Sequence, residues 1–221
     1  IQGAFREKLI AEDYQCVPAG SLSAEEAAMA EPLAVCLHAI KQAGKIFGNK
    51  VLITGSGPIG TLCVAAARRA GAQEIIVTDI STNALKFSNS VGADKVINVY
   101  EEHDELKNYQ SNKGYFDIAI ECSGSEQGIS DSINCLKPKG TLIQLGLGGD
   151  VLIPLVSVTT KELNLKGSFR FHSEFELAVK MMKKKLIDVN PLITHKVDFN
   201  SAKKAFELAL NNDEQSMKVQ L

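Results

Sequence analysis

The sequence predicts an α/β fold with a doubly wound, parallel sheet of six strands. Six strand-like runs alternate with helix-like segments, the central runs are apolar almost throughout, and a glycine-rich turn follows the first of them. A parallel sheet that is covered by helices on both faces requires such continuous apolar strands. The expected strands span residues 50–54, 74–79, 95–99, 116–121, 140–146 and 163–169.

Composition limits the classes of function. The chain has 221 residues, is 45% hydrophobic and carries a formal net charge of −2, so it can bury a substantial core and is not basic enough for a nucleic-acid partner. No apolar run approaches the ~18 residues of a membrane span, and the first residues lack the layout of a signal peptide. We therefore expect a globular, cytoplasmic protein without a nucleic-acid or membrane partner.

The turn after the first strand has the pattern of a dinucleotide site. Its sequence is Gly55-Ser56-Gly57-Pro58-Ile59-Gly60. Gly55 permits the tight reversal, Gly57 lets backbone amides approach a pyrophosphate, and Gly60 allows close packing of the helix on the strand. Pro58 suits the first helical turn, where its missing N–H would have no partner. The positive end of the following helix would then face the phosphates.

A carboxylate at the end of the second strand supports this interpretation. Asp79 lies 19 positions after Gly60, where an acid that binds the adenosine ribose belongs. Beside the 2′-phosphate of NADP it would repel a like charge at ~4 Å by about 1–4 kcal/mol, or roughly tenfold to a thousandfold in affinity. Residues 80–85 contain no Arg or Lys, and Lys86 is the first cation. The sequence therefore predicts a preference for NAD over NADP.

Two further strand ends are expected to line the same crevice. In doubly wound sheets, ligands bind at the carboxyl ends of the strands, where the winding reverses. The segments at those ends are Glu121-Cys122-Ser123-Gly124 and Leu145-Gly146-Leu147-Gly148-Gly149. Their small residues would let the nicotinamide half of a cofactor pass close to the backbone, with ordinary β-to-α turns as the alternative.

The two ends of the chain differ from its middle. Residues 3–10 are strand-like, Pro32 is expected to divide the first helical stretch, and an amphipathic helix through Met182 precedes a helix near 201–211 and a final strand. Two capping boxes are expected to open helices, Ser23-x-x-Glu26 and Ser173-x-x-Glu176. Neither end is large enough for a core of its own, so we expect both to be parts of another unit.

Seven stretches carry a family resemblance: Gly3-Ala4-Phe5, Glu31-Pro32-Leu33-Ala34, Gly55–Gly60, Thr78-Asp79, Glu121–Gly124, Gly146-Leu147-Gly148 and Gly167-Ser168-Phe169-Arg170-Phe171. Over essentially its whole length the chain resembles the zinc-dependent medium-chain dehydrogenases of the sorbitol dehydrogenase branch. Within that branch it is most similar to bacterial dehydrogenases of L-idonate, on the evidence of Lys113–Asp117, Gly167–Phe171, Ser173-Glu174-Phe175 and the terminal Lys218–Leu221.

The resemblance implies a Rossmann-type NAD-binding domain at 32–171, flanked at 1–31 and 172–221 by remnants of a GroES-like catalytic domain. It implies oxidation of a secondary hydroxyl in a polyol or sugar acid, with hydride transfer to NAD and zinc as the Lewis acid. It also implies a homo-oligomer in which coenzyme domains pair through residues 151–153 and 163–169. Family members hold zinc with a cysteine and a His-Glu pair in a domain that would precede Ile1. We therefore expect a chain that binds NAD but is inactive alone.

The resemblance also assigns roles to residues. Glu31 would lie at the catalytic zinc, directly or through a water, and Arg170 would lie between cofactor and substrate. The expected cofactor-binding residues are Gly55, Gly57, Pro58, Ile59, Gly60, Asp79, Ser123, Leu145, Gly146, Leu147, Ser168, Phe169 and Arg170. The alternatives are a charge in a first helical turn for Glu31 and a surface ion pair for Arg170. Phe171 stands where sorbitol dehydrogenases have a tyrosine, which disfavours sorbitol as the substrate.

Metal ligands within the chain itself are not apparent. Its five cysteines and four histidines are dispersed, without a C-x-x-C pair or an H-E-x-x-H motif. A catalytic zinc needs about three protein ligands, so Glu31 alone cannot hold it. Two other functions therefore stay open, a non-catalytic NAD-binding module and a methyltransferase, although Glu31-Pro32-Leu33 and Gly167–Arg170 disfavour the latter.

Overall fold

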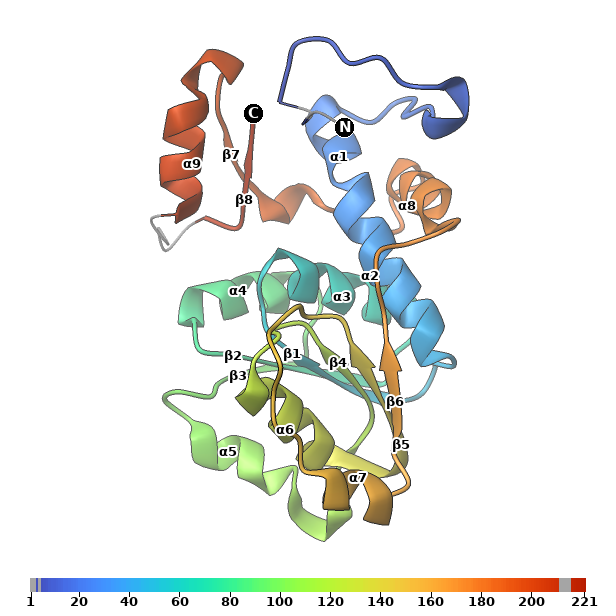
Figure 1. Ribbon diagram of the computed structural model, residues 1–221, viewed down its shortest axis with the longest axis vertical. Helices are drawn as coiled ribbons and strands as arrows, with labels where there is room; N and C mark the ends of the chain where they lie inside the picture. The colour runs from blue at the N-terminus through green and yellow to red at the C-terminus, as the bar shows by residue number, and fades with distance from the viewer. Residues whose placement is uncertain (1–2, 4, 211–215) are drawn as a thin grey trace.

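Six parallel strands form one sheet in the computed structural model, which describes residues 3, 5–210 and 216–221. The strands are β1 Lys50–Thr54, β2 Glu74–Asp79, β3 Lys95–Asn98, β4 Phe116–Glu121, β5 Leu136–Gln144 and β6 Asn164–Gly167. Their order in the sheet is β3-β2-β1-β4-β5-β6 (Figure 1). This is the order of a doubly wound sheet in which the winding reverses between β1 and β4, and it confirms the predicted fold.

Helices cover both faces of this sheet (Figure 1). One face carries α2 Ala30–Ala43, α3 Pro58–Arg69 and α4 Thr82–Ser90, and the other carries α5 His103–Asn108, α6 Glu126–Cys135 and α7 Leu155–Thr160. The remaining helices are α1 Ala24–Ala28, which leads into α2, α8 Glu174–Lys183, which packs on α2, and α9 Ala202–Leu210, which packs on the C-terminal strands. The first strand shows how the layers are built. Val51 and Ile53 belong to the hydrophobic cluster that includes α2, α3 and α8, whereas Leu52 belongs to the cluster that includes α5 and α6. Because successive side chains point to opposite faces, a strand between two helical layers is apolar throughout.

The later strands differ at their ends from the expected ranges. β5 begins at Leu136, four residues early, because Leu136 pairs with Phe116 across a register shift. Residues 145–146 and 168–169 have already left β5 and β6 and belong to loops. Loops at the carboxyl edge are free to face a ligand, so this difference favours a site there.

The N-terminal segment corrects one prediction. The expected strand at 3–10 is wrong for residues 5–10, which contain no strand, and Ala4 lies outside the described residues. The segment is exposed, and Ile10 is 99% accessible. A strand requires a hydrogen-bonded neighbour, and no described segment pairs with this one.

The first capping box is confirmed. The hydroxyl of Ser23 accepts a hydrogen bond from the Glu26 N–H (3.1 Å), and the Glu26 carboxylate accepts one from the Ser23 N–H (2.9 Å). The helical stretch is divided at Met29 rather than at Pro32. Pro32 lies in the first turn of α2, where its missing N–H has no intrahelical partner to lose. The helix α2 also crosses the predicted domain boundary at 31/32, and that division stays a prediction.

The second capping box is wrong. Ser173 makes no side-chain cap to α8, because its backbone is already helical, whereas a capping residue is normally extended. The buried Glu174 carboxylate instead accepts hydrogen bonds from the His172 N–H and from Lys41, each at 2.8 Å. This anchors the start of α8 to α2.

The C-terminal residues form a small unit at the carboxyl edge of the main sheet. A parallel pair, β7 Ile193–Lys196 and β8 Lys218–Gln220, lies next to α9 (Figure 1). The expected helix at 201–211 is confirmed for Ala202–Leu210, and residue 211 lies outside the described residues. The final strand is confirmed as β8.

Candidate functional site

The three glycines of the turn meet three different constraints. Gly55 has a φ of +91°, and a Cβ there would lie 2.9 Å from the Ser123 N atom. A Cβ on Gly60 would lie 1.8 Å from the carbonyl oxygen of Gly55, so the helix packs directly on the turn. A Cβ on Gly57 would meet no described atom within 4 Å. The space beside Gly57 is therefore open, as a phosphate-binding turn requires.

The start of α3 presents unpaired amides to this space. Gly57 is the N-cap and has no side chain to cap the helix, and Pro58 takes the first helical position. The N–H groups of Ile59 and Gly60 lie in the first turn, where they have no intrahelical partner. The first turn, Pro58–Thr61, is fully described and contains no acidic residue. Its positive end is thus available for an anion.

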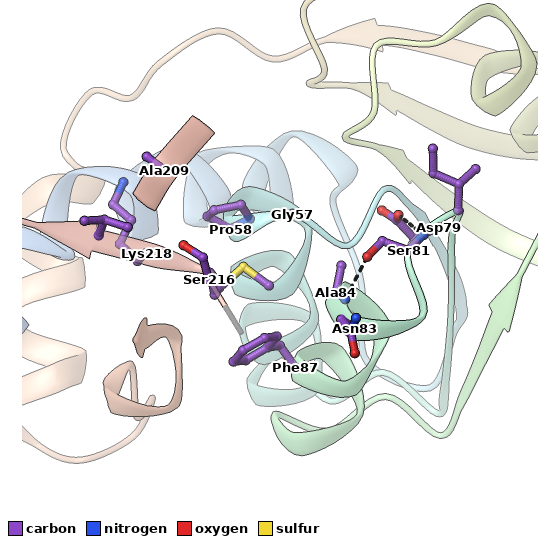
Figure 2. Close-up of a pocket in the computed structure, with 13 residues that line it drawn as sticks. Gly57, Pro58, Asp79, Ser81, Asn83, Ala84, Phe87, Ala209, Ser216 and Lys218 are labelled. Atoms are coloured by element: carbon purple, nitrogen blue, oxygen red, sulfur yellow. Dashed lines mark hydrogen bonds between the residues drawn. The ribbon is translucent and has the colours of Figure 1, made fainter. Parts of the chain in front are cut away.

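Asp79 lies beside this turn and is oriented by two backbone groups. Its Oδ2 accepts a hydrogen bond from the Ser56 N–H (2.6 Å). Its Oδ1 accepts one from the Ser81 N–H (2.8 Å), as Figure 2 shows. The Ser56 hydroxyl donates to the carbonyl of Ala84 on α4 (2.9 Å). The turn, the acid and the start of α4 are therefore one hydrogen-bonded assembly.

A cavity of about 650 Å³ opens at this assembly. Its lining residues are Gly57, Pro58, Asp79, Ile80, Ser81, Asn83, Ala84, Phe87, Ala209, Ser216, Met217, Lys218 and Val219. Figure 2 shows Asp79 and Lys218 on opposite sides of it. Apolar surface from Ile80, Ala84 and Phe87, beside a carboxylate and a turn of free amides, suits a flat base attached to a ribose and a phosphate.

A second cavity, of about 470 Å³, lies beside Ile59 in the first turn of α3. Its lining residues are Val35, Ile59, Cys122, Leu145, Gly146, Leu147, Ser168, Phe169 and Arg170. The structure thus brings together seven of the expected cofactor-binding residues, namely Ile59, Leu145, Gly146, Leu147, Ser168, Phe169 and Arg170. Ser123 does not line either cavity, but its backbone abuts Gly55 of the turn.

Arg170 is presented to this second cavity by an unusual backbone. Its φ is +55°, in the left-handed region that costs a non-glycine residue about 1 kcal/mol or more. Its guanidinium lies 5.4 Å from the centre of the Phe169 ring. No described carboxylate forms an ion pair with it, so the surface ion pair that was the alternative role for Arg170 is not observed.

Glu31 lies at the edge of the same region. It is exposed in the first turn of α2, and Val35, one turn further along that helix, lines the second cavity. Within residues 3, 5–210 and 216–221, no three His, Cys, Asp or Glu side chains come together as a metal site. The described residues therefore do not fit a zinc ion by themselves, and Glu31 could supply one ligand at most.

Some cavity residues were not expected from the sequence. Lys218 and Met217 reach the first cavity from β8 and the residue before it, and Val35 reaches the second cavity from α2. No local motif marks them, because they approach the site through long-range packing. None of the helices that the structure describes is long and apolar enough to cross a membrane.

Comparisons with known proteins agree with this architecture. The model of the family described as zinc-binding dehydrogenase matches residues 58–184, more than half of the chain. L-idonate 5-dehydrogenase (NAD(P)(+)) of Escherichia coli K12 is 36% identical over 223 residues, which cover 100% of this chain and 64% of the relative. Sorbitol dehydrogenase of Ovis aries is 38% identical over 187 residues, which cover 83% of this chain and 53% of the relative.

A solved structure extends the likeness to three dimensions. The crystal structure of L-idonate 5-dehydrogenase from Escherichia coli K-12 matches with a TM-score of 0.91 and 35% identity, over 96% of this chain and 62% of that one. The chain thus spans less than two thirds of the length of these relatives.

Proposed function

Because the chain belongs to the zinc-binding dehydrogenase family, we propose that it is the coenzyme-binding part of an oxidoreductase that transfers hydride from a secondary alcohol to NAD. The single observation that carries this proposal is the contact of Asp79 with the glycine turn at the 650 Å³ cavity. The turn amides and the acid together match the pyrophosphate and the adenosine ribose of a dinucleotide.

The extended cofactor would occupy both cavities. The adenosine half would lie against Asp79, Ala84 and Phe87, and the pyrophosphate would lie against the amides at Gly57 and the start of α3. The nicotinamide would then enter the 470 Å³ cavity past Ile59, which lines that cavity and lies in the first turn of α3. In this arrangement Leu145–Leu147 and Ser168–Arg170 surround the ring that accepts hydride.

The proposed substrate is a polyol or a sugar acid of the L-idonate type. The names of the two similar enzymes support the class, and Arg170, the one cation among the described lining residues of the second cavity, favours an anionic substrate. Phe171 stacks on Phe175 of α8 at 5.6 Å between ring centres. It does not line that cavity, in accord with a substrate other than sorbitol.

Zinc assistance would require ligands beyond those that the described residues bring together. Glu31 is the proposed contribution of this chain, directly or through a water.

We further propose a homo-oligomer that forms through the sheet edge. Among the described strands, β6 pairs with β5 alone, and Leu165 of β6 and Leu152 are exposed. A cytoplasmic location stays a prediction.

The alternative is a non-catalytic NAD-binding module. An assay of the intact gene product that contains this chain, with NAD and a panel of polyols and sugar acids, distinguishes the two. We expect NADH formation with a sugar acid such as L-idonate. Tight NAD binding without turnover on any member of the panel would favour the module, and binding of S-adenosylmethionine in place of NAD would favour a methyltransferase.

A further inference from the structure

Glu121, the last residue of β4, is a carboxylate at the switch point that is fully buried. No described Lys, Arg or His forms an ion pair with it. A buried carboxylate without a cation is costly unless hydrogen bonds satisfy it. Its donors are the N–H groups of Ser123 (2.8 Å) and Gly124 (3.0 Å), the Ser123 hydroxyl, the Gln144 side chain (2.6 Å) and the Thr54 hydroxyl (3.4 Å).

These donors tie two loops to one side chain. Oε1 holds the backbone of Ser123 and Gly124, in the loop that follows β4. Oε2 accepts from Nε2 of Gln144, and the same nitrogen donates to the carbonyl oxygen of Gly146 at 2.9 Å. The main-chain oxygen of Glu121 also accepts from the N–H groups of Leu145 (2.9 Å) and Gly146 (2.8 Å). The loop after β5 therefore depends on Glu121 through both its backbone and its side chain.

The two loops pack directly against each other around this carboxylate. A Cβ on Gly146 would lie 2.7 Å from Oε2 of Glu121. Gly124 has a φ of +66°, and a Cβ there would lie 2.7 Å from the carbonyl carbon of Leu147. Backbone thus faces backbone, and the carboxylate fills the junction.

From this geometry we propose that Glu121 is a positioning residue for the nicotinamide half of the cofactor. This inference rests on the proposed NAD-binding function and names the residue that orders one half of the site. The carboxylate of Glu121 holds the carbonyl of Gly146 through Gln144, and Gly146 lines the 470 Å³ cavity. The described lining of the 650 Å³ cavity contains no residue from 121–149. Loss of the carboxylate should therefore weaken contacts to nicotinamide and spare contacts to adenosine.

The test compares NADH with ADP-ribose, which lacks the nicotinamide, by calorimetric titration of the chain. Glu121→Gln puts an amide NH₂ against either the Ser123 and Gly124 N–H groups or the Gln144 amide, so one set of contacts is lost in either orientation. We expect NADH affinity to fall about tenfold and ADP-ribose affinity to stay within about twofold. The change in dihydronicotinamide fluorescence on binding should shrink in parallel.

A second variant and a control complete the test. Gln144→Met removes the donor that links Glu121 to the Gly146 carbonyl but keeps the bonds to Ser123 and Gly124. It should show the same selective loss of NADH affinity, and it decides the matter alone if Glu121→Gln does not fold. Glu101→Gln, at an exposed carboxylate, should change the affinity for neither NADH nor ADP-ribose.

The outcomes separate this inference from the proposed function. Equal weakening of NADH and ADP-ribose, or unchanged NADH affinity in both variants, would overturn the positioning role. If the unmodified chain binds ADP-ribose and NADH equally, without a fluorescence change, the positioning role fails and the dinucleotide site stands. If the unmodified chain binds neither ligand, both proposals fail.

Discussion

Asp79 accepts a hydrogen bond of 2.6 Å from the peptide N–H of Ser56, and this contact ties the end of β2 to the glycine turn after β1. The second oxygen of Asp79 accepts from the Ser81 N–H at 2.8 Å. A carboxylate oxygen has two lone pairs, so each oxygen keeps one for a ribose hydroxyl. The acid is therefore oriented before a cofactor binds, which reduces the ordering cost of binding.

Asp79 should control the choice between NAD and NADP. We expect Asp79→Ala to lower the ratio of NAD affinity to NADP affinity by roughly tenfold or more, because the repulsion of the 2′-phosphate is removed. Calorimetric titration of the chain with each cofactor measures the ratio. The Escherichia coli relative carries NAD(P)(+) in its name, so the unmodified ratio is itself informative.

Asp79→Asn is the matched control for charge, since it keeps the size of the side chain. It should shift the ratio in the same direction as Asp79→Ala. An affinity ratio that both variants leave unchanged would remove Asp79 from the selectivity role.

The glycines of the turn should separate binding from folding. Gly57→Ala adds a methyl group to open space at a φ of −66°, so stability should change by less than about 1 kcal/mol. NAD affinity should nevertheless fall, because the methyl group occupies the approach of the pyrophosphate. Gly60→Ala should instead destabilise the fold, because its Cβ would overlap the Gly55 carbonyl at 1.8 Å. Thermal unfolding measures the stability of both variants, and calorimetry measures their NAD affinity. Unchanged NAD affinity in Gly57→Ala would contradict the binding of a phosphate at the turn.

Local pattern was sufficient to predict the central sheet and the turn. The apolar run Lys50–Thr54, the glycine spacing and the distance to Asp79 are all short-range features, and each is where the structure requires it. Each leaves a mark that can be read over a few residues, namely the apolar composition of a strand and the glycines of a tight turn. The same holds for the capping box at Ser23.

Features that depend on distant partners could not be predicted in this way. Lys218 reaches the first cavity from the far end of the chain. The burial of Glu121 is sustained by Gln144 on the next strand, which no spacing rule reveals. Ser173 does not cap α8, and the start of that helix is held instead by the contact of Glu174 with Lys41, 133 residues earlier in the chain. Residues 5–10 form no strand because pairing, and not propensity, decides strand formation.

Arg170 should contribute to the nicotinamide half of the site. We expect Arg170→Ala to lower NADH affinity severalfold and to leave stability nearly unchanged, because the residue is exposed and alanine keeps the Cβ that makes a φ of +55° costly. Calorimetry and thermal unfolding provide the two readings. Arg69→Ala, at another exposed cation, is the control. Equal NADH affinity in the unmodified chain and both variants would show that Arg170 does not contribute to binding.

The exposed sheet edge should determine oligomeric state. We expect Leu165→Lys to shift the chain towards monomer in sedimentation velocity, because a charge on an edge strand opposes pairing with a second edge. Leu165 is 42% exposed, so the folded monomer should lose little stability. Leu177→Lys, at a similarly exposed leucine on α8 (44%), is the control and should leave the sedimenting mass of the chain unchanged. A monomeric unmodified chain at all concentrations would contradict an interface at this edge.

Acid should release a specific stabilising contact. Burial acts to raise the pKa of Glu174, but hydrogen bonds from Lys41 and from the His172 N–H outweigh it and lower the pKa to about 2. Since this lies below the ordinary value of 4.5, the contact stabilises the fold above pH 4.5 and is lost as pH falls towards 2. Its size is on the order of 1–3 kcal/mol, because Lys41 is largely solvated. His38, whose Nδ1 lies 3.4 Å from the Glu174 carboxylate, faces the same group.

The measurement is the free energy of unfolding between pH 7 and pH 2. Glu174→Gln should be less stable than the unmodified chain at pH 7, and the difference should shrink as pH falls through this range. Glu176→Gln, which removes an exposed ion pair with Lys180 on the same helix, should differ by about 0.5 kcal/mol or less. A difference for Glu174→Gln that does not depend on pH would show that its ionisation contributes nothing.

Calorimetric titration of the folded chain with NADH tests the central claim most directly. A dinucleotide held by the α3 amides and Asp79 predicts saturable heat with one ligand per chain, and competition by ADP-ribose. Absence of heat with either ligand, on material that unfolds cooperatively, would contradict the claim.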